Sequence, residues 1–127
     1  MYRQSLSSPE RGSAQIGVQN PGGVRSDLAE GDVLFADAAG VLPFANSLFT
    51  VDLTGAQFKT LLEQQWQTNP GGTPPSRPYL QLGLSDNVTY TFDASRAEGD
   101  RITSIAVDGK PIDPTACLLY TSDAADE

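Results

Sequence analysis

The sequence predicts an α+β domain, and three observations support this class. One strongly amphipathic helix is expected near the middle of the chain, at residues 55–67. Short segments with strand-like patterns lie on both sides of it, and after residue 79 they follow one another without an intervening helix. Runs of strands that do not alternate regularly with helices are typical of α+β domains. With 127 residues, the chain has the length of one small domain.

Composition argues against several classes of protein. Apolar residues make up 39% and charged residues 19%, as in an ordinary globular domain. The chain has no histidine, which argues against Ser-His-Asp or Cys-His catalysis and most zinc sites. A formal charge of −8 argues against nucleic acid or anionic membranes as partners. No apolar run is long enough to span a bilayer, and the polar N-terminus shows no secretory signal.

The last eleven residues, 117–127, read CLLYTSDAADE and resemble the translation of a transposase sequencing adapter. We therefore expect a non-native, adapter-derived tail that takes no part in the fold. The alternative is an ordinary acidic tail. Without these residues the chain keeps eight basic and thirteen acidic residues, a formal charge of −5, and loses its only cysteine, Cys117. The polar start at residues 1–13 indicates an internal start, so we expect an open-reading-frame fragment whose native part is residues 1–116.

The segments before the central helix predict two strands and a short helix. Residues 14–18 form a short apolar run typical of a buried strand, and Asn20-Pro-Gly-Gly-Val-Arg25 follows as a tight loop. Residues 33–42 are apolar and rich in alanine, which favours a short helix leading to Pro43. Residues 46–53 alternate partly between polar and apolar side chains, which predicts a second strand.

The central helix has the clearest signature. Thr54 and Gln57 have the spacing of a capping box, in which each side chain bonds the backbone N–H of the other residue. Apolar side chains then recur at helical spacing and predict a core-facing stripe. They are Phe58, Leu61, Leu62 and Trp66. The polar side chains expected to face away from this stripe are Lys59, Glu63, Gln64 and Gln67.

Beyond the helix, a proline- and glycine-rich loop is expected at residues 68–78. Short strands are expected after it, at residues 79–82, 87–92, 101–107 and 110–112. Asp108-Gly109 is a strong signal for a two-residue hairpin between the last two strands. We expect neither an internal repeat nor a second domain within these 127 residues.

The loop at residues 20–25 is the first candidate ligand site. Gly22 and Gly23 tolerate positive φ, so we expect the turn to aim backbone N–H groups at an anion. Arg25 adds a fork of donors suited to phosphate or carboxylate, and Asn20 offers both a donor and an acceptor. The alternative is a plain surface loop.

Phe44 and Asn46 form the second candidate site. An aromatic face with an amide nearby suits a nucleobase, because the ring stacks on the base while the amide bonds its edge. The alternative is that Phe44 belongs to the core and Asn46 begins a turn. The lack of histidine and of clustered carboxylates argues against a metal site in this chain.

Three motifs occur in a fixed order: IGVQNPGGVR at residues 16–25, VLPFAN at 41–46 and LTGAQFKTLLEQQ at 53–65. Together with further matches between residues 90 and 114, they resemble the C-terminal domain of the 5′-nucleotidase family. The resemblance covers about residues 14–116. It implies a partial, layered α/β/β/α domain with a mixed sheet and one main amphipathic helix.

The resemblance also implies roles for the candidate residues. The substrate-binding loop would contain Asn20, Gly22, Gly23 and Arg25, with Arg25 directed toward the phosphate. Phe44 would be one of two aromatic rings that enclose the base, and Asn46 would lie beside the base.

Enzymes of this family also carry an N-terminal metallophosphoesterase domain with two divalent metal ions, which has no counterpart here. We therefore expect no cofactor and no catalysis in this chain alone. The expected partners are a nucleotide substrate and that missing domain, with no nucleic acid and no membrane segment. The parent is expected to be a periplasmic, extracellular or cell-surface 5′-nucleotidase, UDP-sugar hydrolase or cyclic-nucleotide phosphodiesterase. The alternative is a stand-alone, non-catalytic module that binds a nucleotide or another anion.

Overall fold

The computed structural model describes residues 2–44, 46–69 and 71–124. The elements before the long loop are α1 (Tyr2–Ser5), a 3₁₀ turn (Pro9–Arg11), β1 (Ile16–Gln19), a second 3₁₀ turn (Pro21–Gly23), α2 (Phe35–Val41), β2 (Ser47–Thr54) and α3 (Gly55–Glu63). The elements after it are β3 (Gly83–Leu84), β4 (Val88–Phe92), β5 (Ile102–Val107), β6 (Lys110–Pro111) and β7 (Cys117–Ala124). This mixture confirms the predicted α+β class.

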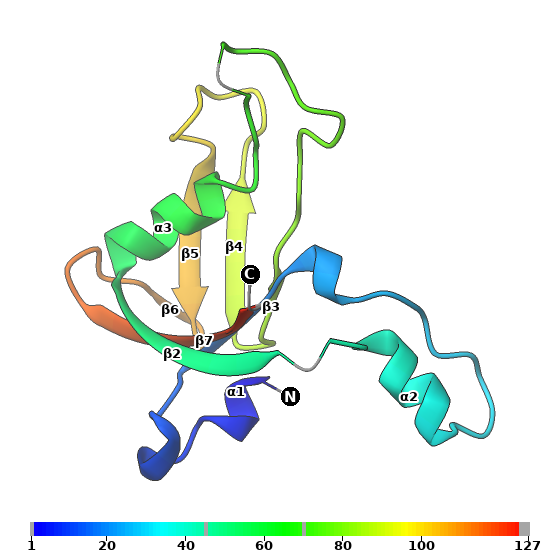
Figure 1. Cartoon of the computed structure of the whole chain (residues 1–127). Coiled ribbons are helices and arrows are strands. Elements are labelled where there is room, and N and C mark those ends of the chain that lie inside the picture. Colours follow the sequence, from blue (N-terminus) through cyan, green and yellow to red (C-terminus); the bar gives the residue numbers. More distant parts are fainter. Residues whose placement is uncertain (1, 45, 70, 125–127) are drawn as a thin grey trace.

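The strands form two sheets. The first has the order β2-β7-β1-β3 and is mixed, because β7 runs parallel to β1 and antiparallel to β2. The second is the antiparallel meander β4-β5-β6. Figure 1 shows α3 beside β4 and β5, with the long strands β2 and β7 curving beneath them.

The hydrophobic core lies between α3 and the two sheets. Its buried side chains come from β1, α3, β4 and β5, and they are Ile16, Val18, Phe58, Leu62, Val88, Ile102 and Ile105. Phe58 and Leu62 are fully buried, while Leu61 and Trp66 are partly buried against this cluster. The predicted apolar stripe is therefore confirmed as the packing face of α3. Burying one such side chain stabilises the fold by about 1.5–3 kcal/mol.

The N-terminus of α3 is capped as predicted. The Thr54 hydroxyl accepts from the Gln57 amide at 3.2 Å, and the Gln57 side-chain oxygen accepts from the Thr54 amide at 2.8 Å. The backbone N–H groups of Gly55 and Ala56 donate to carbonyls of the 113–116 loop, each at 3.0 Å. A Cβ on Gly55 would overlap a backbone carbonyl of that loop, so only glycine permits this close approach.

The loop that caps α3 is itself held by a carboxylate. Asp113 Oδ1 accepts from the Thr115 hydroxyl at 2.7 Å and from the Thr115 amide at 2.8 Å. These two bonds to the charged form lower the pKa of Asp113 below its ordinary value of 3.8. Asp93 makes the same pair of bonds to Ser95, and they lower the pKa of Asp93 in the same way.

Thr115→Val is expected to raise the pKa of Asp113 toward its ordinary value, because the hydroxyl bond to the carboxylate is lost. The pKa of Asp93 should stay unchanged and serves as an internal control. A carbon-13 NMR titration of the carboxyl groups measures both values. Since the folded-state pKa is depressed, the contribution of Asp113 to stability is present above the unfolded pKa and is lost as pH falls through the folded value. An unchanged Asp113 pKa in Thr115→Val would show that the Thr115 hydroxyl does not lower it.

Most other predicted elements are confirmed, with boundaries shifted by a few residues. They are β1, α2, β2, β4, β5 and β6. The hairpin at Asp108-Gly109 is also confirmed: φ is 52° at Asp108 and 75° at Gly109, as a type I′ turn requires. Helix α1 and the two 3₁₀ turns were not predicted.

The C-terminal end of α3 differs from the prediction. The helix ends at Glu63 rather than at Gln67. The reason is Gln65, which is 2% exposed and whose side-chain nitrogen donates to the Leu62 carbonyl at 2.9 Å. This carbonyl would otherwise accept the next helical bond from Trp66.

The strand predicted at residues 79–82 is not formed, and Gln65 is again the reason. The Leu80 amide donates to the Gln65 backbone carbonyl, and the Leu82 amide donates to the Gln65 side-chain oxygen, each at 2.9 Å. Only an isolated bridge joins Trp66 and Tyr79 in this segment, and regular pairing begins at β3.

Residues 117–124, interpreted from the sequence as part of a tail outside the fold, form β7 between β1 and β2 (Figure 1). Leu118 and Tyr120 of this strand pack against the core, partly buried. Thr121 is fully buried, and its hydroxyl has no hydrogen-bond partner among the described residues. An unsatisfied buried hydroxyl destabilises a fold by about 1–3 kcal/mol. Strand pairing does not test the origin of these codons, so the adapter-derived origin stays a prediction.

Candidate functional site

The predicted ligand loop follows β1 directly and is organised by Asn20. Its side-chain oxygen accepts from the Gly22 amide at 3.1 Å, and its backbone carbonyl accepts from the Gly23 amide at 3.0 Å. Neither glycine has a positive φ. The prediction that these two amides are aimed at an anion is therefore wrong, because the cap formed by Asn20 on the 3₁₀ turn uses both of them.

Arg25 connects this loop to the segment that carries Phe44. Its backbone N–H donates to the Val41 carbonyl, at the end of α2, at 2.9 Å. Its guanidinium carbon lies 5.9 Å from the centroid of the Phe44 ring, within the range of a cation–π contact. Two candidate residues from different sequence motifs are thus brought together.

Phe44 is 51% exposed, so the alternative that it belongs to the core is wrong. Asn46 lies partly buried immediately before β2. Gly23 is buried, whereas Gly22 lies at the surface of the loop. A Cβ on Gly22 would meet no atom closer than 3.6 Å, so close packing does not require glycine at that position.

The Arg25–Phe44 pair combines a positive charge with an exposed aromatic ring. No carboxylate among the described residues forms an ion pair with Arg25. Its charge is therefore available to an external anion, while the exposed part of the Phe44 ring is available for stacking. No group of three or more His, Cys, Asp or Glu side chains in the described part of the chain is placed to hold a metal ion.

A depression of about 220 Å³ borders the loop and was not predicted from the sequence. Asn20 and Pro21 form one side of it, and Leu61 and Gln64 of α3 form another. Its remaining walls include Leu80 and Leu82, which the hydrogen bonds of Gln65 hold in place. No local signal joins these segments, because they are separated by about 40 to 60 residues from the loop.

Residues 5–119 match the family model of the 5′-nucleotidase C-terminal domain. The trifunctional nucleotide phosphoesterase YfkN of Bacillus subtilis is 31% identical over 109 residues, which cover 84% of this chain and 7% of that protein. The NAD 5′-nucleotidase of Haemophilus influenzae is 34% identical over 119 residues, which cover 88% of this chain and 19% of that protein. The solved structure of the Haemophilus influenzae NAD nucleotidase has a TM-score of 0.72 at 28% identity, over 97% of this chain and 22% of that one.

The chain therefore spans less than a fifth of these two curated relatives. No helix among the described residues has the length and apolar character needed to cross a membrane. The matched region contains the Asn20–Arg25 loop, Phe44 and the whole of α3. The resemblance seen in the sequence is confirmed by both sequence and fold: the chain belongs to the 5′-nucleotidase family and corresponds to its C-terminal domain.

Proposed function

We propose that this chain is the nucleotide-recognition part of a secreted nucleotide phosphohydrolase of the 5′-nucleotidase type. The observation that supports this most directly is the contact between Arg25 and the exposed Phe44 ring. In the proposal, Arg25 binds a phosphate oxygen with charge-assisted hydrogen bonds. Phe44 stacks on the base, Asn46 lies beside the base, and Asn20 with the two glycines keeps the loop in its shape.

In this proposal, the chemical step takes place on another domain of the parent protein. A metallophosphoesterase domain with two divalent ions would supply the nucleophile and neutralise charge on the phosphate. The present chain would hold the nucleotide and present its phosphate to those ions. Two relatives, a nucleotide phosphoesterase and an NAD 5′-nucleotidase, support a nucleotide as the substrate class. We place the parent in the periplasm, outside the cell or at its surface.

The chain alone is expected to release no phosphate from AMP in the presence of Mn²⁺ or Zn²⁺, because the metal-binding domain is a separate unit in the proposal. A phosphate-release assay on the purified chain measures this against a sample without protein. The Arg25→Ala variant is the control for contamination, since a foreign phosphatase would give equal rates in both preparations. Turnover above background that Arg25→Ala reduces would contradict the assignment of catalysis to another domain.

A stand-alone nucleotide- or anion-binding module is the second candidate. It is supported by the fact that the Arg25–Phe44 contact is complete within this chain. The genomic sequence upstream of the coding region separates the two. An in-frame metallophosphoesterase domain with an Asn-His-Glu motif supports the hydrolase, and a stop codon in its place supports the module.

A further inference from the structure

We propose that a second cavity, on the side of the first sheet that carries α1, binds the phosphate group of a small phosphorylated molecule through Arg3. The cavity has a volume of about 420 Å³, within the range of small-molecule sites. Its polar walls include Arg3 and Gln4 of α1, Gln19 of β1, and Ser85 and Asp86 after β3. Neither Arg25 nor Phe44 lines it, so the inference does not depend on the proposed function.

Arg3 carries the positive charge of the cavity and forms a long ion pair with the exposed carboxylate of Asp86. Its Nη1 atom is buried and makes no hydrogen bond within the described structure. The nearest carboxylate oxygen, Asp86 Oδ1, lies 3.7 Å away, which is beyond hydrogen-bonding distance. The Asp86 side chain is 98% exposed and thus remains largely hydrated. The Arg3 side chain as a whole is 33% exposed and lines the cavity, so the charge of its guanidinium is within reach of a phosphate group bound there.

Hydrogen bonds and close packing hold the backbone around Arg3 in place, so the cavity has defined walls. The Gly17 amide donates to Ser85 Oγ at 3.0 Å, and Ser85 Oγ donates to Asn87 Oδ1 at 2.7 Å. A Cβ on Gly17 would approach the Arg3 backbone nitrogen to 3.2 Å, so α1 packs closely on this position of β1. These contacts hold α1 and the turn after β3 against the same strand.

The lining favours a phosphate ester over other ligands. Guanidinium groups match the geometry of phosphate oxygens and bind them with two parallel hydrogen bonds. The cavity contains a single carboxylate, Asp86, which is too few for a metal site. Val18, Leu42 and Leu84 give the cavity an apolar part that suits the organic portion of the ligand.

The test is a titration of the full chain with ribose 5-phosphate and with inorganic phosphate, followed by amide NMR at constant ionic strength. Saturable shifts are expected at the amides of Gly17, Gly83 and Ser85. Arg3→Gln should weaken binding at these reporters about tenfold or more. Arg77→Gln removes the same charge from an exposed loop position and should leave the affinity unchanged.

Asp86→Asn gives the opposite expectation. Removing a negative charge 3.7 Å from Arg3 Nη1 should tighten phosphate binding several-fold. A cavity that binds cations would instead bind less tightly after Asp86→Asn, and that result would overturn the proposal. The absence of saturable shifts in the unaltered chain, or unchanged affinity in a folded Arg3→Gln variant, would do the same. If Arg3→Gln alters the whole spectrum, Arg3→Lys replaces it: this variant keeps the charge but loses the two parallel hydrogen bonds, so it should weaken phosphate binding while Asp86→Asn tightens it. Unchanged affinity in a folded Arg3→Lys variant would then overturn the proposal.

The two ligand sites are distinguishable in one experiment. Gly22 and Gly23 report on the Arg25 loop, while Gly17 and Gly83 report on the Arg3 cavity. Arg25→Ala should therefore remove shifts only from the first pair of amides, and Arg3→Gln only from the second pair. If no binding is detected at the Gly22 and Gly23 amides, the proposed function fails while binding at the Gly17 and Gly83 amides can still support the Arg3 cavity, and the reverse also holds.

Discussion

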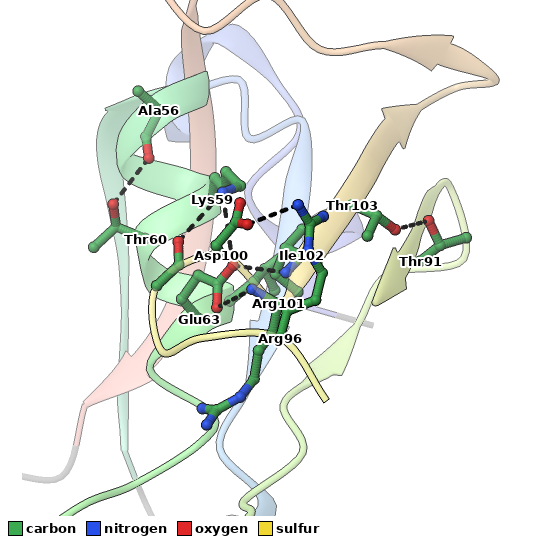
Figure 2. A network of polar contacts seen from close by, with 12 residues as sticks. Ala56, Lys59, Thr60, Glu63, Thr91, Arg96, Asp100, Arg101, Ile102 and Thr103 are labelled. Carbon is green, nitrogen blue, oxygen red and sulfur yellow. Dashed lines mark hydrogen bonds and ion pairs between the residues drawn. The ribbon is translucent and has the colours of Figure 1, made fainter. Parts of the chain in front are cut away.

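Glu63→Ala is expected to destabilise the chain by about 2–5 kcal/mol, because it would leave two inward-facing backbone donors without an acceptor. Glu63 is 7% exposed, and its two carboxylate oxygens accept from the backbone N–H groups of Arg101 at 3.1 Å and Ile102 at 2.6 Å. Figure 2 shows the carboxylate between the end of α3 and the start of β5, with Lys59 on the same helix. The Lys59 Nζ atom lies 3.7 Å from Glu63 Oε1. The bonds therefore join α3 to the second sheet.

The size of the effect follows from what each amide loses. A buried donor left unsatisfied destabilises a protein by about 1–3 kcal/mol. The Ile102 amide is buried and the Arg101 amide is partly buried, so the expected total is somewhat less than twice that range. Small domains have a total stability of about 5–15 kcal/mol, so this loss would be a large part of it. Urea unfolding followed by circular dichroism measures the change.

Two further variants make this experiment specific. Glu98→Ala removes an exposed carboxylate that accepts a weak bond from the Thr68 hydroxyl at 3.4 Å, and should change stability by less than about 0.5 kcal/mol. Glu63→Gln keeps one acceptor oxygen but places an N–H₂ group against the other amide, so its stability should lie between those of Glu63→Ala and the unaltered chain. Equal stability of Glu63→Ala and Glu98→Ala would show that the carboxylate does not hold β5 in place.

Glu63 also illustrates what helical periodicity cannot predict. The pattern places Glu63 away from the apolar stripe, and a charged residue there is expected in solvent. Glu63 is instead buried, because its carboxylate accepts from the backbone amides of two residues that lie 38 and 39 positions further along the chain. Local signals such as the Thr54–Gln57 capping box and the Asp108-Gly109 turn were predicted correctly, because their bonding partners lie within a few residues.

The pairing of distant segments was the part of the fold that the sequence could not supply. β7 lies between β1 and β2, although residues 117–124 were interpreted from the sequence as part of a tail. In the candidate site, the residue types in the loop were consistent with an anion site. In the structure, however, the Gly22 and Gly23 amides donate to the side-chain and backbone oxygens of Asn20. The contact between Arg25 and Phe44 was not predicted, since the two residues lie in separate motifs and no local signal connects them.

Phe44→Ala is expected to weaken AMP binding to the chain roughly tenfold and to leave ribose 5-phosphate binding at the Arg25 loop almost unchanged. The reason is that stacking of one base on an aromatic ring contributes about 1–3 kcal/mol, and only AMP has a base. Phe49→Ala is a matched control, because Phe49 on β2 is 49% exposed, almost as much as Phe44. Amide NMR titrations, read at Gly22 and Gly23, give the dissociation constants for both ligands.

Arg25→Ala should weaken both ligands by about ten- to a hundredfold, because a charge-assisted contact to phosphate contributes about 1.5–3 kcal/mol. Arg77→Ala is the control for the loss of one positive charge at an exposed position.

The Arg25 guanidinium lies over the Phe44 ring, so each single variant also removes a contact that positions the other side chain. The Arg25→Ala/Phe44→Ala double variant is therefore expected to lose less AMP binding free energy than the sum of the two single losses. Phe44 is half exposed, so none of these changes should lower Tm by more than a few degrees. Equal weakening of both ligands by Phe44→Ala, together with a clearly lower Tm, would instead identify Phe44 as a packing residue and remove it from the nucleotide site.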